Sequence, residues 1–459
     1  MTNVEELAES SPIDFLLQRF AENAGHTAFV CEGRELSYAW LLGQIRAWLS
    51  YIRDARIDAG QVVALTGDYS PEVCSLLLSL VHTCTIVVPF ASVSGGEKAQ
   101  LARIANVQAD LVFEGDAFAR LEHHGGRVEN PLLTSLIARK APGLVVFSSG
   151  SAGTPKAILH DVTRILDKFR VRRKTLRSLV FLQLDHLGGI NTLLYVLSNG
   201  GTVISLHDRA PRTVCAAIER YRIELLPVTP SFLHLLIASG EHKTRDLSSL
   251  RVITYGTEVM PQATLDRVRE LFPGVLLQQT YGLSELGVLR TKSREDGSLW
   301  VKVGGEGFQT KVVDEVLWIK AESAMLGYLN APQPFDADGW FNTEDRVEVD
   351  GEYLRILGRN SEIINVAGQK VFPSEVENLL IQVENVKDAV VRGEKNVLVG
   401  SIVVATLRLV RPEDHEQVKR RVKEFCRERL SAYKIPQRIE ITDDPLHGAR
   451  FKRMRNRTR

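Results

Sequence analysis

Short runs of apolar, often β-branched residues alternate along the chain with segments whose apolar residues recur at helical spacing. The apolar runs lie at residues 27–31, 62–67, 85–90, 111–113, 144–147, 179–183, 202–206, 225–229 and 252–255. The amphipathic segments lie at residues 38–55, 71–83, 96–106, 189–199, 212–221, 230–238 and 262–272. Several of the runs are apolar on both faces, which is typical of parallel strands covered by helices. The pattern therefore predicts an α/β protein with parallel or mixed sheets.

The pattern changes after residue 275. The segments LWVKVG, FQTKVVDEVLWIK and DGEYLRILG alternate polar and apolar residues as hairpin strands do, which predicts a small antiparallel sheet or barrel. The tail that follows GRNSE has the order strand, helix, two strands, long helix and strand, which indicates a small α+β domain. We therefore predict a large N-terminal domain at 1–358, a hinge at 359–362 and a small C-terminal domain at 363–459.

Composition narrows the possible functional classes. Of the 459 residues, 44% are apolar and 25% are charged, which is typical of a globular chain. The 57 basic and 56 acidic residues leave a net charge of +1, which disfavours nucleic acid or an anionic membrane as a partner. The five cysteines are widely spaced, and no apolar run reaches the ~20 residues of a membrane-spanning helix. We expect a cytoplasmic protein without a membrane span.

The most informative segment is VFSSGSAGTPKAILH, residues 146–160. An apolar strand leads into small and hydroxylated residues that end in Lys156, and a second apolar strand follows. Small residues let backbone N–H groups approach an anion, hydroxyls add donors and lysine adds charge, so the loop suits phosphate. It is not a Walker loop, because Pro155 separates Thr154 from Lys156 and no Ser or Thr follows. A surface loop with an incidental lysine is the alternative.

Two further segments place polar groups beside predicted strands. In QQTYGLSELG, Tyr281 offers a ring for a planar base, while Ser284 and Glu285 offer oxygens for a hydrated Mg²⁺. In GWFNTEDRVEVDGEYLRILGRNSE, Asp345 and Arg359 end successive hairpin strands and together suit the vicinal hydroxyls of a ribose. When each segment is considered alone, an alternative explanation exists. A common Tyr-Gly turn explains the first segment, and an ordinary surface ion pair explains Asp345 and Arg359.

In this order, the three segments resemble the signature motifs of the adenylate-forming superfamily of acyl-CoA and aryl-CoA ligases, luciferases and peptide-synthetase adenylation domains. SSGSAGTPK is similar to (S/T)SG(S/T)TGxPK, TYGLSE to YGxTE, and GWFNTED…GRNSEIINVAGQKVFPSEVE to GWxxTGD…GRxxDxIxxxGxxVxPxEVE. ELSYAWL resembles the family's early LTYxEL segment, and FLQLDHLGGINTLLYVLSNGGTVI its His-containing acyl-pocket segment. The resemblance covers nearly the whole chain.

The resemblance implies two half-reactions that use ATP and Mg²⁺. A carboxylate attacks the α-phosphate of ATP, giving an acyl-adenylate and pyrophosphate, and a thiol then expels AMP. The small domain is implied to act as a lid that rotates at the hinge, where Ser361 stands.

Site residues follow from the same resemblance. The residues implied to bind the ATP phosphates are Ser148, Ser149, Gly150, Ser151, Gly153, Thr154, Lys156 and Ser284. The residues implied for adenine and ribose are Gly256, Thr257, Glu258, Tyr281, Asp345 and Arg359. The acyl pocket is implied to contain His186, Gly188, Gly189, Thr229 and Gly282. Lys156 and Glu285 are expected to be catalytic, with Glu285 also binding Mg²⁺.

The C-terminal segment departs from the family pattern. The family has a catalytic lysine in a PxTxxGKxxR-like stretch, where this chain has DPLHGARFKRMRN. Arg450 takes the position of that lysine, and Lys452 is the other candidate for its role. The planar fork of arginine does not superpose on a lysine ammonium, so this exchange is not conservative. Asn365 also replaces a lysine that is frequent in the hinge segment. These departures leave a non-catalytic nucleotide-binding relative as an alternative.

The nature of the substrate is less defined than the chemistry. Members that activate amino acids have an Asp in the segment where His186 stands here, so an amino acid is disfavoured. The small residues expected in the acyl pocket leave room for an aryl or an aliphatic acid. We expect a carboxylic acid:CoA ligase, as a monomer or homodimer. An enzyme that loads the phosphopantetheine arm of an acyl carrier protein is the alternative.

Overall fold

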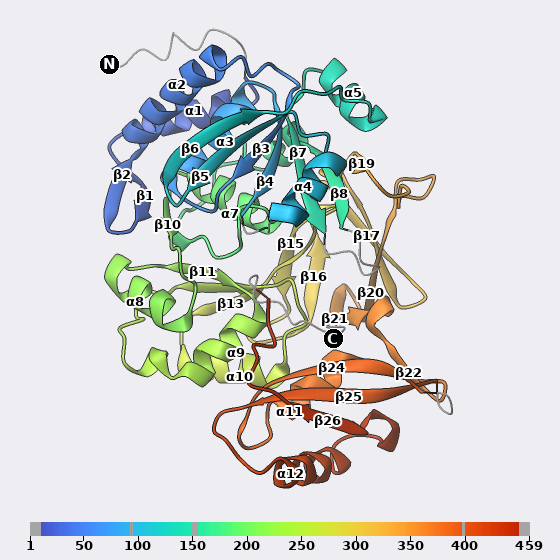
Figure 1. Ribbon diagram of the computed structural model, residues 1–459. Coiled ribbons are helices and arrows are strands. Elements are labelled where there is room, and N and C mark those ends of the chain that lie inside the picture. Colours follow the sequence, from blue (N-terminus) through green and yellow to red (C-terminus); the bar gives the residue numbers. More distant parts are fainter. Residues whose placement is uncertain (1–10, 92, 94, 149–154, 397–399, 449–459) are drawn as a thin grey trace.

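The computed structural model describes residues 11–91, 93, 95–148, 155–396 and 400–448. Four sheets organise this part of the chain, and a small domain of strands and helices lies below the large one in Figure 1. The predicted α/β class, with an antiparallel sheet and a small α+β C-terminal unit, is confirmed. Among the described residues, no helix has the length and apolar character that crossing a bilayer requires.

Two mixed sheets lie above the small domain in Figure 1; the first is mostly parallel, and the second combines parallel and antiparallel pairs. The first runs in the order β13 (Leu276–Gln279), β12 (Val252–Tyr255), β11 (Leu225–Val228), β9 (Arg177–Leu179), β10 (Thr202–Ser205), β1 (Thr27–Cys31) and β2 (Arg34–Ser37). The second runs in the order β19 (Gly327–Tyr328), β8 (Lys156–Asp161), β7 (Gly143–Ser148), β4 (Ile86–Phe90), β3 (Val62–Thr66), β5 (Ala109–Glu114) and β6 (Ala117–His123). Strands β3 and β4 are buried almost throughout, as the doubly apolar runs predict.

The third sheet has seven strands, and its neighbouring strands pair in antiparallel orientation. Its order is β14 (Tyr281–Leu283), β15 (Gly287–Ser293), β16 (Val301–Gly304), β21 (Tyr353–Arg359), β20 (Phe341–Asp350), β18 (Val316–Ala321) and β17 (Phe308–Val313). The sheet of the small domain contains β23 (Gln369–Val371), β22 (Ile364–Val366), β25 (Gly400–Leu409) and β24 (Val386–Asn396), and β26 (Arg438–Ile441) pairs with β25. A short 3₁₀ turn, Asn360–Glu362, connects the two sheets.

Several helices begin at residues whose side chains cap them. Ser70 and Thr229 accept hydrogen bonds from the backbone N–H groups of Val73 and Phe232, and a proline occupies the first turn in both cases. The helices of the large domain are α1 (Asp14–Glu22), α2 (Tyr38–Asp54), α3 (Pro71–His82), α4 (Gly95–Ile104), α5 (Pro131–Ala138), α6 (Val162–Asp167), α7 (Leu187–Ser198), α8 (Pro211–Tyr221), α9 (Pro230–Ser239) and α10 (Gln262–Leu271). The small domain has α11 (Pro373–Leu380) and α12 (His415–Arg427).

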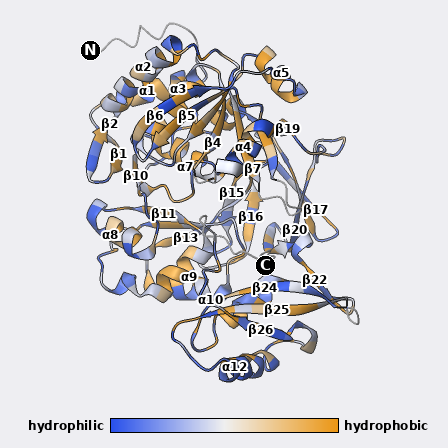
Figure 2. Cartoon of the chain, viewed as in Figure 1, coloured by the Kyte–Doolittle hydropathy of each residue, from blue (hydrophilic) through white to orange (hydrophobic). Residues whose placement is uncertain are grey.

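The largest hydrophobic cluster lies between the two mixed sheets. It joins α1, α2, α3 and α7 to inward side chains of both sheets, while α8, α9 and α10 cover the first sheet in a second cluster. The small domain has its own cluster, which begins at Ile364. Figure 2 shows the apolar strands in the interior and the polar face of α12 at the surface. The two mixed sheets are thereby fixed to each other through shared helices.

Some local expectations differ from the structure. Helix α1 begins at Asp14 with Ile13 as its N-cap, although Ile13 has no side-chain oxygen for capping; the Ser11 N–H donates a hydrogen bond to the Asp14 carboxylate. Strand β5 covers the apolar run at 111–113, whereas strand β6 and helices α5 and α6 are additional to the predicted elements. Strand β6 is an exposed edge strand, so it lacks the apolar alternation that would reveal it.

A buried arginine connects three of the helical segments. Arg19 of α1 donates to the carbonyls of Phe169 and Ser198 at 2.7 and 2.9 Å, and also to that of Arg170. We expect Arg19→Met to leave buried carbonyls without donors and to lower the free energy of unfolding by at least about 2 kcal/mol. The measurement is thermal or urea unfolding. The control Arg46→Met removes an exposed arginine from α2, and an equal loss in both variants would contradict this role.

Candidate functional site

One cavity of about 870 Å³ lies where the carboxyl ends of β11, β12 and β13 face the antiparallel sheet. Ligands of α/β proteins commonly bind outside the carboxyl ends of parallel strands. The predicted site residues that line the cavity are Ser148, Lys156, His186, Gly188, Gly256, Thr257, Glu258, Tyr281, Gly282, Ser284, Glu285, Asp345, Arg359 and Ser361. The fold therefore brings together residues that lie more than 200 positions apart in the chain.

Other predicted site residues lie elsewhere. Ser149, Gly150, Ser151, Gly153, Thr154, Arg450 and Lys452 fall outside the described residues. Gly189 and Thr229 are described, but they do not contribute to the cavity lining. Thr229 is fully buried and caps α9. A Cβ on Gly189 would lie 2.6 Å from the Leu182 carbonyl, so this glycine serves close backbone packing.

The base of the predicted phosphate loop is held from a distant part of the chain. Ser148 and Lys156 lie directly opposite each other where the antiparallel strands β7 and β8 meet the loop. Asn330 accepts a hydrogen bond from the Ala157 N–H at 2.8 Å and donates to the Pro155 carbonyl at 2.9 Å. The side chain of Asn330 thus fixes the chain on which Lys156 lies. No sequence motif indicates this role, because the contact joins segments more than 170 residues apart.

A buried carboxylate connects three strands of the antiparallel sheet. Asp345 of β20 is 7% exposed, and it lies directly across from Arg359 of β21, whose Nε is 3.5 Å from its Oδ1. The Tyr281 hydroxyl of β14 donates to Asp345 Oδ2 at 2.5 Å. Burial raises the pKa of Asp345, and the charge of Arg359 and the hydrogen bond from Tyr281 oppose that rise. The arrangement holds the carboxylate beside the cavity.

The residue before Asp345 has an unusual backbone conformation. Glu344 has a φ angle of +60°, which residues other than glycine rarely adopt, and the family motif has glycine at this position. The Asn342 side chain accepts from the Glu344 N–H at 2.8 Å, and Thr343 Oγ1 accepts from the Asp345 N–H at 3.1 Å. Side-chain hydrogen bonds therefore support the turn that directs Asp345 inward.

Glu285 contacts the edge strand β19. Its Oε1 accepts a hydrogen bond from the Tyr328 hydroxyl at 2.9 Å, and the Lys156 ammonium lies 4.9 Å from the centre of the Tyr328 ring. The second carboxylate oxygen, Oε2, receives no hydrogen bond from the described residues. Carboxylate oxygens are the ligands that Mg²⁺ prefers, so Glu285 fits the predicted metal. Tyr328, like Asn330, carries no sequence signal for the site.

The Gly256-Thr257-Glu258 turn ends β12 at the cavity. Thr257 has φ of +72°, an outlier for a β-branched residue, and a Cβ on Gly256 would lie 2.7 Å from the Thr280 carbonyl. Glu258 accepts hydrogen bonds from the N–H and hydroxyl of Ser231. Gly256 therefore allows close contact of two backbones, and the strained turn directs Thr257 and Glu258 toward the cavity.

His186 stands at the start of α7. Its Nδ1 accepts a hydrogen bond from the Gly188 N–H at 3.0 Å, so it caps the helix and lines the cavity at the same time. A Cβ on Gly282 would lie 2.8 Å from the Gly287 carbonyl, which shows that this glycine lets β14 approach β15. The expectation that glycines leave the acyl pocket open thus holds only in part, because Gly189, Gly256 and Gly282 are needed for packing.

A family comparison decides the identity of this site. The model of the AMP-binding enzyme family matches residues 16–329, and that of the AMP-binding enzyme C-terminal domain matches residues 375–449. The chain belongs to the AMP-binding enzyme family. This confirms the resemblance to the adenylate-forming superfamily that the motifs indicate.

Relatives within the family are named as CoA ligases. The indoleacetate–CoA ligase of Aromatoleum aromaticum is 28% identical over 92% of both chains. The 4-coumarate–CoA ligase 4 of Arabidopsis thaliana is 26% identical over 92% of this chain and 86% of its own. The crystal structure of the anthranilate CoA ligase AuaEII with anthranoyl-AMP matches with a TM-score of 0.81 at 20% identity, covering 98% of this chain and 97% of that one. That last similarity establishes the shared fold.

The buried His160 predicts a pH dependence of stability. Its Nε2–H donates to the Ser284 carbonyl at 2.7 Å, and burial lowers its pKa to about 4. An unfolded histidine has a pKa of about 6.5, so the unfolded chain binds the proton first as the pH falls. The contribution is complete above pH 6.5, is lost as the pH falls toward 4, and amounts to about 2 kcal/mol between pH 7 and pH 5.

We expect His160→Gln to remove this part of the pH dependence, because glutamine keeps an N–H donor but does not titrate. The measurement is unfolding of both proteins at pH 7 and pH 5, with the exposed His124→Gln as the control. The same pH dependence in wild type and His160→Gln would contradict the assignment.

Asn330 predicts a specific defect in nucleotide binding. We expect Asn330→Leu to release the chain around Lys156 and to weaken Mg-ATP binding about tenfold, since two hydrogen bonds are lost. Calorimetric titration with Mg-ATP gives the affinity, and thermal unfolding shows whether the fold is intact. An unchanged affinity for Mg-ATP in a folded Asn330→Leu variant would show that the hydrogen bonds of Asn330 have no influence on the predicted phosphate loop.

Proposed function

We propose that the protein is an AMP-forming, ATP-dependent ligase that joins a carboxylic acid to the thiol of CoA. The observation that carries the proposal is one continuous cavity. Lys156, Glu285, Asp345 and Arg359 line one part of it, and apolar strand residues such as Leu225 and Val252 line another. A nucleotide and an acid can therefore bind in one enclosed space with their reacting groups adjacent.

In the first half-reaction, a substrate carboxylate oxygen attacks the α-phosphorus of ATP. The bond from that phosphorus to the oxygen that bridges the α- and β-phosphates breaks, and pyrophosphate leaves with the electron pair. Such a transfer needs positioning and charge neutralisation more than covalent participation. Lys156 supplies positive charge at the loop, and Ser148 and Ser284 supply hydroxyl groups. Glu285 would hold Mg²⁺, which neutralises phosphate charge when bound.

In the second half-reaction, the thiol sulfur attacks the acyl carbonyl. The C–S bond forms, the bond from the acyl carbon to the phosphate oxygen breaks, AMP leaves, and the thiol proton passes to solvent. Asp345 and Arg359 are placed to bind the ribose hydroxyls in both steps, and the Tyr281 ring lies beside them for adenine. The role of the ribose pair is supported by their cross-strand register, which keeps both groups at one point of the cavity wall.

CoA is the favoured acceptor and an aryl acid the favoured class of substrate. The relatives named for indoleacetate, 4-coumarate and 2-succinylbenzoate act on aryl acids with CoA. An acyl carrier protein presents the same thiol, so it is the comparison that the experiment must include.

The test is acid-dependent exchange of labelled pyrophosphate into ATP with a panel of aryl and aliphatic acids. We expect exchange with wild type, and a KM for ATP raised about 10-fold to 100-fold in Asp345→Asn, because a charged hydrogen-bond acceptor is lost. Asp350→Asn, an exposed position of the same strand, is the matched control.

Thioester formation with CoA and with a phosphopantetheinylated carrier protein then separates the two acceptors. Absence of exchange with every acid, together with retained Mg-ATP binding, would favour a non-catalytic nucleotide-binding protein instead.

A further inference from the structure

The cavity continues beyond the nucleotide-binding residues to the amino ends of two strands. Leu225 and Val252, which begin β11 and β12, line it, and so do Asn191 of α7 and Val288 of β15. Each of these parallel strands is about 10 Å long from its first residue to its carboxyl end. The carboxyl ends lie on the side of the predicted nucleotide-binding residues. We call this region the far end of the cavity.

A lysine lies directly behind the wall of the far end. Lys168 donates to the side-chain oxygen of Asn191 and to the Val288 carbonyl, the latter at 3.2 Å. An ammonium group only donates, so Asn191 directs its Oδ1 to Lys168. The Asn191 NH₂ group then has no protein acceptor among the described residues. The wall therefore offers N–H donors to a molecule in the cavity.

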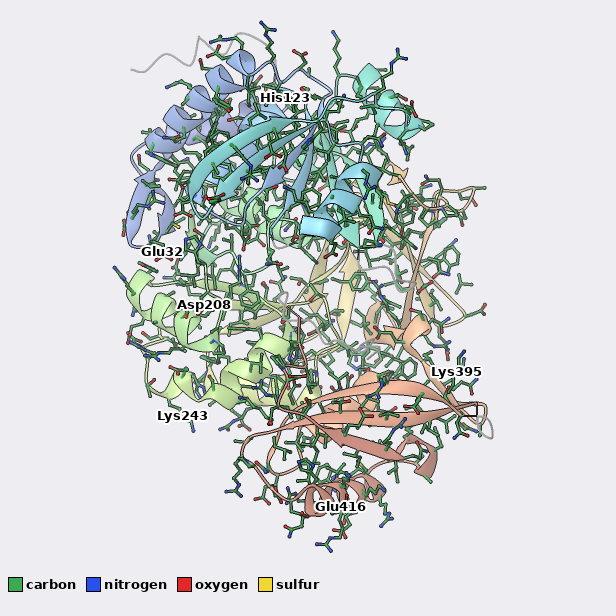
Figure 3. The ribbon with its side chains drawn as sticks, viewed as in Figure 1. Glu32, His123, Asp208, Lys243, Lys395 and Glu416 are labelled. Atoms are coloured by element: carbon green, nitrogen blue, oxygen red, sulfur yellow. The ribbon has the colours of Figure 1, made fainter. Side chains whose placement is uncertain are left out.

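The positive charge at this position is not balanced by protein carboxylates. Within the described ranges, Lys168, Arg173 and Arg290 form no ion pair, and Arg173 itself lines the cavity. Burial first, and then the charges of Arg290 and Arg173, lower the pKa of Lys168 to about 8. Lysines such as Lys243 and Lys395 lie at the periphery of the molecule in Figure 3, whereas Lys168 donates to groups of α7 and β15.

The acids of the cavity are all at its other end. The carboxylates in the lining are Glu258, Glu285, Glu344, Asp345 and Glu362, which belong to the nucleotide-side turn, the signature motifs and the hinge turn. A half-buried cation without a counter-ion is costly, and an anion of a ligand would offset that cost. The far end therefore suits a negatively charged group, and two N–H donors with a nearby guanidinium match a carboxylate.

We propose that the far end binds a second carboxylate of the acid substrate, remote from the carboxyl group that is adenylated. The substrate class is then a dicarboxylic acid that is activated at one end only. This inference rests on the proposed function, since it assigns the far end to the acyl part of the substrate. Lys168 acts as a positioning residue through Asn191 and contributes charge.

A tether is the competing explanation for Lys168, because its hydrogen bonds also connect the end of α6 to α7 and β15. A tether would affect all acids equally. A carboxylate site affects only acids that carry the second charge. The ratio of kcat/KM for matched pairs of acids therefore distinguishes the two explanations.

The experiment measures acid-dependent pyrophosphate exchange with matched pairs. The aryl pair is 4-carboxyphenylacetate and 4-methylphenylacetate, and the aliphatic pairs are the diacids from succinate to suberate with the monoacids of equal length. We expect wild type to favour at least one diacid over its monoacid about tenfold or more. Lys168→Met and Asn191→Leu should each reduce that preference about tenfold while leaving the KM for ATP unchanged, and Lys168→Arg should restore part of it.

Arg172→Ala is the control, because Arg172 is an exposed neighbouring cation that pairs with Glu22. Equal activity on monoacids and diacids in wild type would overturn the inference and leave the proposed function intact. So would an unchanged preference in a folded Lys168→Met or Asn191→Leu variant. If no acid supports exchange, the proposed function fails, and the inference fails with it.

Discussion

The contact of Asp345 with Tyr281 and Arg359 sets the arrangement of the whole site. A carboxylate can remain buried beside a cavity only when donors and a cation accompany it, and here they come from two other strands. The Asp345–Arg359 pair depends on the register of β20 and β21, and a one-residue slip of either strand would place the two side chains on opposite faces of the sheet. Tyr281 begins β14, which is an edge strand of the same sheet. The three strands therefore have to meet where the nucleotide would bind.

Charge is distributed unevenly along the cavity. Carboxylates line the part that faces the phosphate loop and the hinge turn, while the uncompensated cations surround the opposite part. In the proposed function, a nucleotide with its magnesium ion would bring both positive and negative charge to the first part and would balance the carboxylates there. Because the two ends of the cavity differ in charge, the cavity orients a substrate whose own ends differ in charge before any specific contact forms.

Sequence reasoning identified the class of fold and many of the residues that line the cavity, because both depend on local signals. Doubly apolar runs indicated β3 and β4, and the spacing of small residues before Lys156 indicated the loop. The roles of Asn330 and Tyr328 could not be predicted, since neither residue lies in a motif and both reach the site through the pairing of β19 with β8. Thr229 and Gly189 were assigned to the acyl pocket although helix capping and close backbone packing explain them. Local sequence does not distinguish a residue that faces a cavity from one that supports the wall.

The hydrogen bonds of Asn330 connect two segments of the chain that are synthesised at different times. Lys156 leaves the ribosome long before Asn330, yet its strand is held in the observed position by hydrogen bonds to Asn330 and by pairing with β19. A nascent chain that has not reached residue 330 lacks these contacts, so ATP cannot stabilise it by binding to the completed loop. Ligand-assisted folding of the large domain is thus confined to the stage after nearly three quarters of the polypeptide has been made.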